Sequence, residues 1–181
     1  MYSLFKKVIL NLLLLAFVVS TEALATVRED AIKSGFLYNF ALYSQGDWFN
    51  PSLQSNYNLC SYNPQFIDVA KNTLKGLTIK NRPVVANLLT SATEDSIQCH
   101  TLFVAKIDVE QWNRLMVKGR LSQSMLVGDF ESFIPSGGHI SFFIVGGKVR
   151  FEIDPVKLKQ AGINMSSKVL RLGRMHQRGL Q

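Results

Sequence analysis

Residues 139–154 carry the pattern that most constrains the fold, because two alternating apolar segments flank the pair Gly146-Gly147. Two consecutive glycines in this position are typical of a two-residue β-hairpin turn. A slip of one residue would expose the apolar side chains, so the sequence predicts a fixed register with the apolar face on the core. The predicted apolar pairs are Ile140–Ile153, Phe142–Phe151 and Ile144–Val149, and the half-polar pairs on the other face are His139–Asp154, Ser141–Glu152 and Phe143–Arg150.

The rest of the chain alternates between helical and strand-like segments. Apolar spacing and capping residues predict helices at 27–43, 64–76, 109–118 and 155–161, and a last helix capped by Ser166 or Ser167. Short apolar runs predict strands at 58–62, 83–89, 101–105 and 124–127, of which the second and third are expected to be buried. This order predicts the α/β class, as a single-domain mixed β-sheet flanked by helices, with a C-terminal β-hairpin and a terminal helix.

Some aromatic and aliphatic side chains are expected to face the core. The helix at 109–118 is predicted to turn Trp112, Leu115 and Met116 inward, and the last helix is predicted to do so with Val169, Leu170 and Leu172. For Trp48 and Phe49, in a loop after the first helix, two interpretations stay open. They either fill the edge of the core or anchor an interface.

The first 25 residues have the composition of a secretory signal peptide. Lys6 and Lys7 precede an apolar run from residue 8 to residue 19, and Ala23-Leu24-Ala25 places small residues at the cleavage positions. We expect cleavage after Ala25, which leaves residues 26–181 as one exported domain without a transmembrane segment. The run is shorter than the roughly 20 residues of a spanning helix, although an uncleaved signal anchor stays open.

Charge and cysteine usage narrow the class further. The formal net charge of +7 comes without a clustered basic groove or interleaved aromatics, so it does not indicate nucleic-acid binding. The chain has two cysteines, Cys60 and Cys99. In an exported protein a disulfide between them is the default, and two buried free thiols are the alternative.

Catalytic and metal-binding patterns are weak. The sequence has no Gly-x-Ser-x-Gly elbow, no phosphate-binding loop and no dinucleotide-binding glycine triplet. The histidines at 100, 139 and 176 lack the spacing of metal ligands, and the loop carboxylates Asp129 and Glu131 are expected to be solvated. We therefore predict a binding or regulatory protein and not an enzyme, with no cofactor and no metal.

An ordered set of motifs resembles YfiR-like periplasmic proteins. It begins with GFLYNFA at 35–41 and continues through LC at 59–60, GLTIKNRPV at 76–84 and CHTLFV at 99–104. The most specific part is GGHISF at 137–142 with GKVRFEI at 147–153, followed by AGINMSS at 161–167 and LRL at 170–172. The resemblance covers nearly all of the chain after residue 25.

This resemblance implies a compact α/β protein of the periplasm that forms dimers. It implies that Cys60 and Cys99 match the family's disulfide, whereas the chain has no cysteines for the second disulfide that members can carry. It also implies repression of an inner-membrane diguanylate cyclase, or of another envelope sensor protein, through docking to its periplasmic part. Such a repressor tunes cyclic-di-GMP signalling and biofilm formation. A periplasmic small-ligand binding protein is the alternative.

The predicted contact surface combines the half-polar hairpin face with the basic C-terminal segment. Lys168, Arg171, Arg174 and Arg178 form either a solvated helix face or a docking surface for an acidic partner or a membrane headgroup layer. The residues predicted to contact the partner are Phe143, Arg150, Glu152, Leu170, Arg171 and Arg174.

Overall fold

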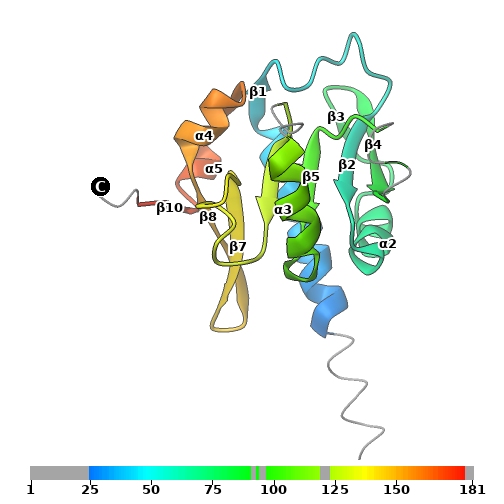
Figure 1. The fold of residues 1–181 in the computed structure, drawn as a ribbon. Helices are drawn as coiled ribbons and strands as arrows, with labels where there is room; N and C mark the ends of the chain where they lie inside the picture. The colour runs from blue at the N-terminus through cyan, green and yellow to red at the C-terminus, as the bar shows by residue number, and fades with distance from the viewer. Residues whose placement is uncertain (1–24, 91–92, 94–96, 119–122, 178–181) are drawn as a thin grey trace, which may run out of the picture.

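The computed structural model describes residues 25–90, 93, 97–118 and 123–177, and these residues form an α/β fold around one large mixed sheet (Figure 1). The strands of that sheet follow the order β10-β8-β7-β6-β5-β2-β4-β3, and β1 pairs with β9 separately. The strands are β1 (Ser44–Gly46), β2 (Tyr57–Ser61), β3 (Thr78–Ile79), β4 (Arg82–Leu88), β5 (Thr101–Val104), β6 (Met125–Gly128), β7 (Ile140–Val145), β8 (Lys148–Ile153), β9 (Ile163–Met165) and β10 (Arg174–Met175). A helix at 25–42 precedes α2 (Pro64–Thr73), the 3-10 turn η1 (Lys106–Asp108), α3 (Val109–Lys118), α4 (Pro155–Gln160) and α5 (Ser167–Leu170).

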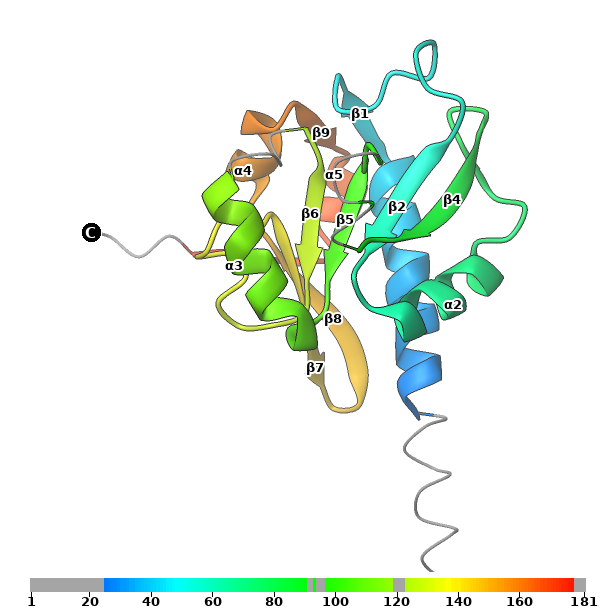
Figure 2. The same ribbon diagram turned by 45° about the vertical axis from the view of Figure 1, so that its right-hand side comes forward.

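Helices cover both faces of the sheet (Figure 2). The helix at 25–42 and α2 bury Phe40 and Phe66 in one apolar cluster with Phe103 of β5. On the opposite face, Trp112 of α3 packs in a second cluster with Leu102 of β5. Neighbouring residues of β5 therefore point into different clusters, as strand geometry requires.

The central strands β2, β5 and β6 run parallel to one another. All four residues of β5 and all four of β6 are buried, which is typical of parallel strands covered by helices on both faces. The disulfide between Cys60 of β2 and Cys99, just ahead of β5, joins two adjacent strands with a Cα–Cα distance of 5.8 Å. The predicted bridge is thus confirmed.

The β7–β8 hairpin has the predicted register at every pair from Ile140–Ile153 to Val145–Lys148. Gly146 and Gly147 have φ angles of 56° and 70°. Positive values at both central positions are required by a two-residue hairpin turn of type I′. The apolar face does lie on the core except for Ile144, which is half exposed. Strand β6 pairs with β7 only as far as Ser141, so the tip of the hairpin extends beyond the sheet.

Helix caps agree with the sequence. The Asn63 side chain accepts a hydrogen bond from the Phe66 N–H, and Asp154 accepts from the two N–H groups that follow Pro155. Of the two serines, Ser166 caps α5. Each cap satisfies helix N–H groups that would otherwise lack a partner.

The structure favours one of the two open interpretations of the loop aromatics, and it corrects three other expectations. Trp48 and Phe49 are buried, and the Phe49 ring packs edge-on against Tyr57 at 4.9 Å, which favours the core interpretation. Met116 and Leu172 are exposed. Met116 lies one position beyond the inward side of α3, and Leu172 lies where the chain leaves α5 for β10. Strand β4 is largely half buried because only the short β3 covers its outer edge.

Most of the predicted signal peptide, including Ala23, lies outside the described residues. Ala25 is the first described residue and is helical, so cleavage after it stays a prediction. Within the described ranges, none of the helices combines the length and the apolarity needed to cross a membrane.

Candidate partner-binding surface

The half-polar face of the hairpin is the starting point of the candidate surface. Phe143 lies opposite Arg150, and Ser141 lies opposite Glu152, on the side of the strands that turns away from Phe142 and Phe151. Arg150 is exposed, Phe143 and Glu152 are half buried, and Ser141 is buried. The Ser141 hydroxyl donates to the Phe130 carbonyl, so its polar group is engaged within the protein.

Strand β10 returns to this face and pairs in parallel with β8, which brings Arg174 beside Glu152. The Arg174 guanidinium donates to Glu152 Oε2 from both Nε, at 2.9 Å, and Nη2. It also lies over the Phe143 ring, 4.5 Å from the centroid, at a distance typical of a cation–π contact. His176 Nδ1 lies 2.5 Å from Glu152 Oε1. We call these four residues the Glu152 cluster.

The cluster holds Glu152 in its charged form. Partial burial raises the pKa of this carboxyl, but the hydrogen bonds from His176 and Arg174 and the charge of Arg174 outweigh the burial and lower the pKa below its usual value. The carboxylate fixes the guanidinium in one position above the Phe143 ring. Beside the cluster lies a hollow of about 380 Å³, whose other side is lined by residues that include Asp129 and Glu131.

A second charged group, which we call the Lys33 cluster, lies at the carboxyl edge of the parallel strands. The Lys33 ammonium donates to Asp129 Oδ2 at 2.6 Å and forms an ion pair with Glu29 at 2.6 Å. Asp30 and Asp108 complete the cluster, and both are buried. The pairing of Lys33 with Asp129 ties the first helix to the residue after β6. Asp129 also accepts from the Lys106 N–H, so the expectation that it is merely solvated was wrong.

Burial sets the protonation of this second cluster. It raises the pKa of Asp30 and of Asp108, and nearby carboxylates add to the effect. Burial also lowers the pKa of Lys33, but the charges and hydrogen bonds of Asp129 and Glu29 outweigh it, so that pKa lies above its usual value. Asp108 Oδ2 is buried without a hydrogen-bond partner. Lys33 and Asp129 are 96 residues apart, and no local pattern in the sequence indicates their contact.

The predicted contact residues do not all lie together. Phe143, Arg150, Glu152 and Arg174 share one face of the hairpin. Leu170 of α5 packs against the cluster that contains Phe151, on the core side of the hairpin. Arg171 is exposed just after α5. The structure thus brings four of the six together and leaves Leu170 and Arg171 on a neighbouring element.

Two of the three histidines are buried and neutral. His100 and His139 each accept a backbone N–H at Nδ1, from Asn58 and Leu126 respectively. Burial lowers the pKa of each to about 4. Among the described residues, no group of three or more histidine, cysteine or acidic side chains could hold a metal ion. Both imidazoles act as hydrogen-bond acceptors for backbone N–H groups of the sheet.

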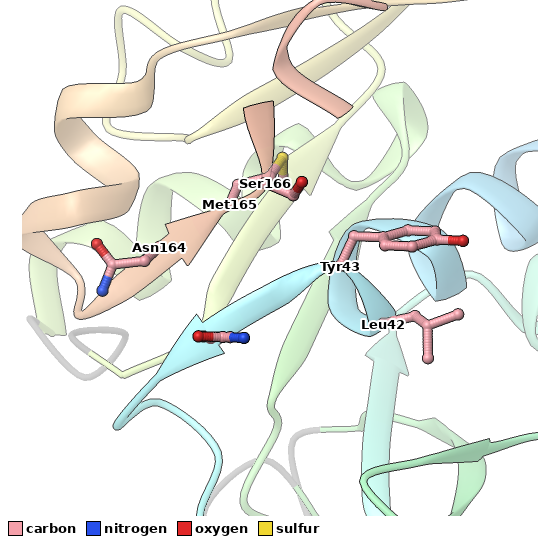
Figure 3. Close-up of a pocket in the computed structure, with 6 residues that line it drawn as sticks. Leu42, Tyr43, Asn164, Met165 and Ser166 are labelled. Atoms are coloured by element: carbon pink, nitrogen blue, oxygen red, sulfur yellow. The ribbon is translucent and has the colours of Figure 1, made fainter. Parts of the chain in front are cut away.

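Another hollow, of about 400 Å³, lies where β1 meets β9 (Figure 3). Leu42 and Tyr43 border it at the end of the first helix, and Asn164, Met165 and Ser166 border it from β9. Leu42 and Tyr43 are exposed, and Figure 3 shows their side chains projecting from the helix end on one side of the β1–β9 pair. Sequence reasoning did not find this hollow, because the three-residue strands that build it lack a periodic pattern.

Comparison with known proteins adds one match. A family model described as YfiR/HmsC-like matches residues 30–174. The matched range extends from the first helix to β10, and includes both cysteines and all six predicted contact residues. Among the curated proteins, none matches this chain.

Proposed function

Because the chain belongs to the YfiR/HmsC-like family, we propose that it represses an inner-membrane diguanylate cyclase by docking to the periplasmic region of that enzyme. The family is one of periplasmic, non-catalytic regulators of diguanylate cyclases. Repression of the cyclase lowers cyclic-di-GMP and so limits biofilm formation. The protein acts after export, with the signal peptide removed after Ala25.

The observation that carries this proposal is the preorganised face around the Glu152 cluster. Glu152 holds Arg174 over Phe143, so a cation, an aromatic ring and a carboxylate are fixed before any partner arrives. Binding then costs less side-chain entropy than it would on a surface of free long side chains. Arginine and aromatic residues are also enriched at the centres of protein interfaces. Arg150, exposed opposite Phe143, adds a charge that can pair with an acidic partner.

Repression by docking requires no chemistry on this chain. A ligand shifts a conformational equilibrium only by the difference between its affinities for the two states. The protein must therefore bind the inactive conformation of the cyclase more tightly than the active one. Contacts to Phe143, Arg150, Glu152 and Arg174 supply that difference, and Leu170 and Arg171, at the end of α5 and outside this face, are proposed as further contacts.

Charge reversal tests the surface. Arg150→Glu is expected to weaken binding to the purified periplasmic region of the cyclase by about tenfold, and Arg171→Glu is expected to weaken it less, because Arg171 lies outside the preorganised face. Binding is measured by calorimetry, and circular dichroism checks the fold. Lys71→Glu, on the exposed side of α2, is the matched control and should bind normally. Unchanged affinity in the folded Arg150→Glu variant would exclude this surface.

Dimer formation is also part of the proposal. The protein is expected to form a homodimer, which sedimentation analysis of the purified protein would detect.

A small-ligand binding function is the alternative, favoured by the hollow between β1 and β9. A thermal-shift screen with amino acids and nucleotides tests it, and a ligand whose effect is lost in Tyr43→Ala would assign that function to the hollow.

A further inference from the structure

Three separate segments protrude from one end of the molecule, and each places an exposed aliphatic side chain beside an exposed cation. They are the start of the first helix (Val27 and Arg28), the η1 turn (Lys106 and Ile107) and the hairpin tip (Ile144, Val145 and Lys148). Ile107 is 81% exposed and Val145 is 59% exposed. In both Figure 1 and Figure 2, the beginning of the first helix, the lower end of α3 and the hairpin tip point in the same direction.

The topology explains why these segments meet at one end. Strands β5, β6 and β7 are parallel, so the η1 turn after β5 and the hairpin turn after β7 leave the same edge of the sheet. The pairing of Lys33 with Asp129 fixes the first helix to that edge as well. The protrusions are therefore held by the core of the fold and are not independent loops.

The charges at this end favour an anionic partner. Arg28, Lys106, Lys148 and Arg150 are exposed. Most of the nearby carboxylates do not repel an anion strongly, because Asp30 and Asp108 are buried and Glu29 and Asp129 are paired with Lys33. Glu110 at the start of α3 and Glu131, three residues after β6, are exposed and oppose the attraction. The outermost groups are thus mainly aliphatic and cationic.

We propose that this end of the molecule rests on an anionic phospholipid surface. Val27, Ile107 and Val145 would enter the boundary between headgroups and acyl chains, while Arg28, Lys106 and Lys148 would bind lipid phosphates. Proteins bind a membrane interface when apolar side chains enter the boundary between headgroups and acyl chains and basic side chains attract anionic lipids. A protein interface would instead favour a contiguous patch rich in aromatic residues, methionine and arginine. The contact with lipid would hold the exported protein next to an inner-membrane target. The proposed lipid binding does not depend on which protein that target is.

Vesicle binding tests the proposal without any protein partner. Protein purified from the periplasm is mixed with phosphatidylcholine vesicles that contain or lack phosphatidylglycerol, and the bound fraction is measured by co-sedimentation. Binding is expected only with phosphatidylglycerol and is expected to weaken as salt is added. Ile107→Asp should lower the partition coefficient about tenfold, and Lys148→Gln about fivefold. Glu110→Gln should strengthen binding.

The matched control is Leu53→Asp. Leu53 is 78% exposed, but it lies in the segment between β1 and β2, at the opposite end of the molecule (Figure 1). This variant should bind vesicles like the native protein. The proposal is wrong if the native protein does not bind, if neutral vesicles bind it equally well, or if Ile107→Asp and Val145→Asp bind normally. Normal vesicle binding by these two variants together with weaker cyclase binding would assign this end to the protein partner. Because the vesicles contain no cyclase, failure here leaves the test at Arg150 unaffected.

Discussion

The Lys33 cluster and the Glu152 cluster use the same kinds of charged groups at different depths. Lys33 is buried, with 5% of its side chain exposed, and it joins the first helix to the carboxyl edge of the sheet. Arg174 is 64% exposed and joins the last strand to the hairpin. The carboxylates Asp129 and Glu152 are almost equally buried, at 16% and 17% exposed. Because only the cations differ, water screens the pair of Arg174 more than that of Lys33, and the two clusters contribute to stability and to recognition in different proportions.

The difference separates structure from function within one molecule. An uncompensated charge in the Lys33 cluster would remain away from water, at a cost of several kcal/mol. A charge released in the Glu152 cluster would be hydrated at little cost, but the surface that it orders would be lost. Substitutions that leave a charge unpaired in the first cluster should therefore reduce stability, and substitutions in the second should reduce binding.

Lys33→Met should have the largest effect on stability. Methionine fills a similar volume but leaves Asp129 and Glu29 without their cation beside the buried Asp30. We expect the free energy of unfolding to fall by about 3 kcal/mol or more, measured by urea denaturation followed by circular dichroism. The control is Lys71→Met, whose partner Asp68 lies 4.0 Å away in an exposed pair, and its effect should stay below about 0.5 kcal/mol.

A double substitution sharpens this test. Lys33→Met combined with Asp129→Leu removes both members of the buried pair and should recover part of the lost stability, because no unpaired charge is left between them. If Lys33→Met alone lowers the free energy of unfolding no more than Lys71→Met does, burial does not make the Lys33 ion pairs more important for stability than an exposed pair.

Asp108→Asn should have an effect of intermediate size on stability, and it should raise the free energy of unfolding. Asparagine has nearly the same size and shape as aspartate, but it carries no charge to desolvate. Because the pKa of Asp108 is raised in the folded state, the ionised side chain costs stability at neutral pH. That cost disappears as the pH falls through the raised pKa toward the usual value of 3.8.

The variant should therefore be more stable than the native protein at pH 7, by about 1 kcal/mol. The difference should shrink as the pH approaches 4, which urea denaturation at several pH values would measure. Subtracting the native curve from the variant curve removes the contributions of the other titrating groups. A constant difference across this range would show that Asp108 is not the group whose charge is penalised.

The sequence predicts the hairpin and the helix caps because their signals are local. The alternation of residues 140–153 around two glycines encodes the register, and Asn63 and Asp154 lie directly before the prolines that begin their helices. Each of these structures requires only contacts between residues close in the chain. The same reasoning explains why the sequence predicts that Phe143, Arg150 and Glu152, which the hairpin contributes to the candidate surface, lie on one face.

The remaining features depend on contacts that no local pattern encodes. Strand β10 has two exposed residues, so neither alternation nor hydrophobicity indicates that Arg174 pairs with the hairpin. The Lys33–Asp129 contact spans 96 residues. Trp48 follows a helix in a polar loop, and its burial depends on the packing of the chain against β2. Sequence reasoning selected Arg174 from its charge, but the geometry alone gives it a position over Phe143.

Glu152→Gln should have the smallest effect on stability and a large effect on binding. The amide keeps one acceptor but loses the charge that holds Arg174 and His176, so we expect the free energy of unfolding to change by less than about 1 kcal/mol. Affinity for the cyclase should nevertheless fall about tenfold, because the guanidinium is no longer fixed over the Phe143 ring. Arg174→Lys should resemble this variant, since an ammonium cannot make the two-nitrogen contact.

A large loss of stability in Glu152→Gln would place this cluster with the Lys33 cluster, as a part of the fold. Normal binding by both folded variants would mean that the order of this face contributes nothing to recognition.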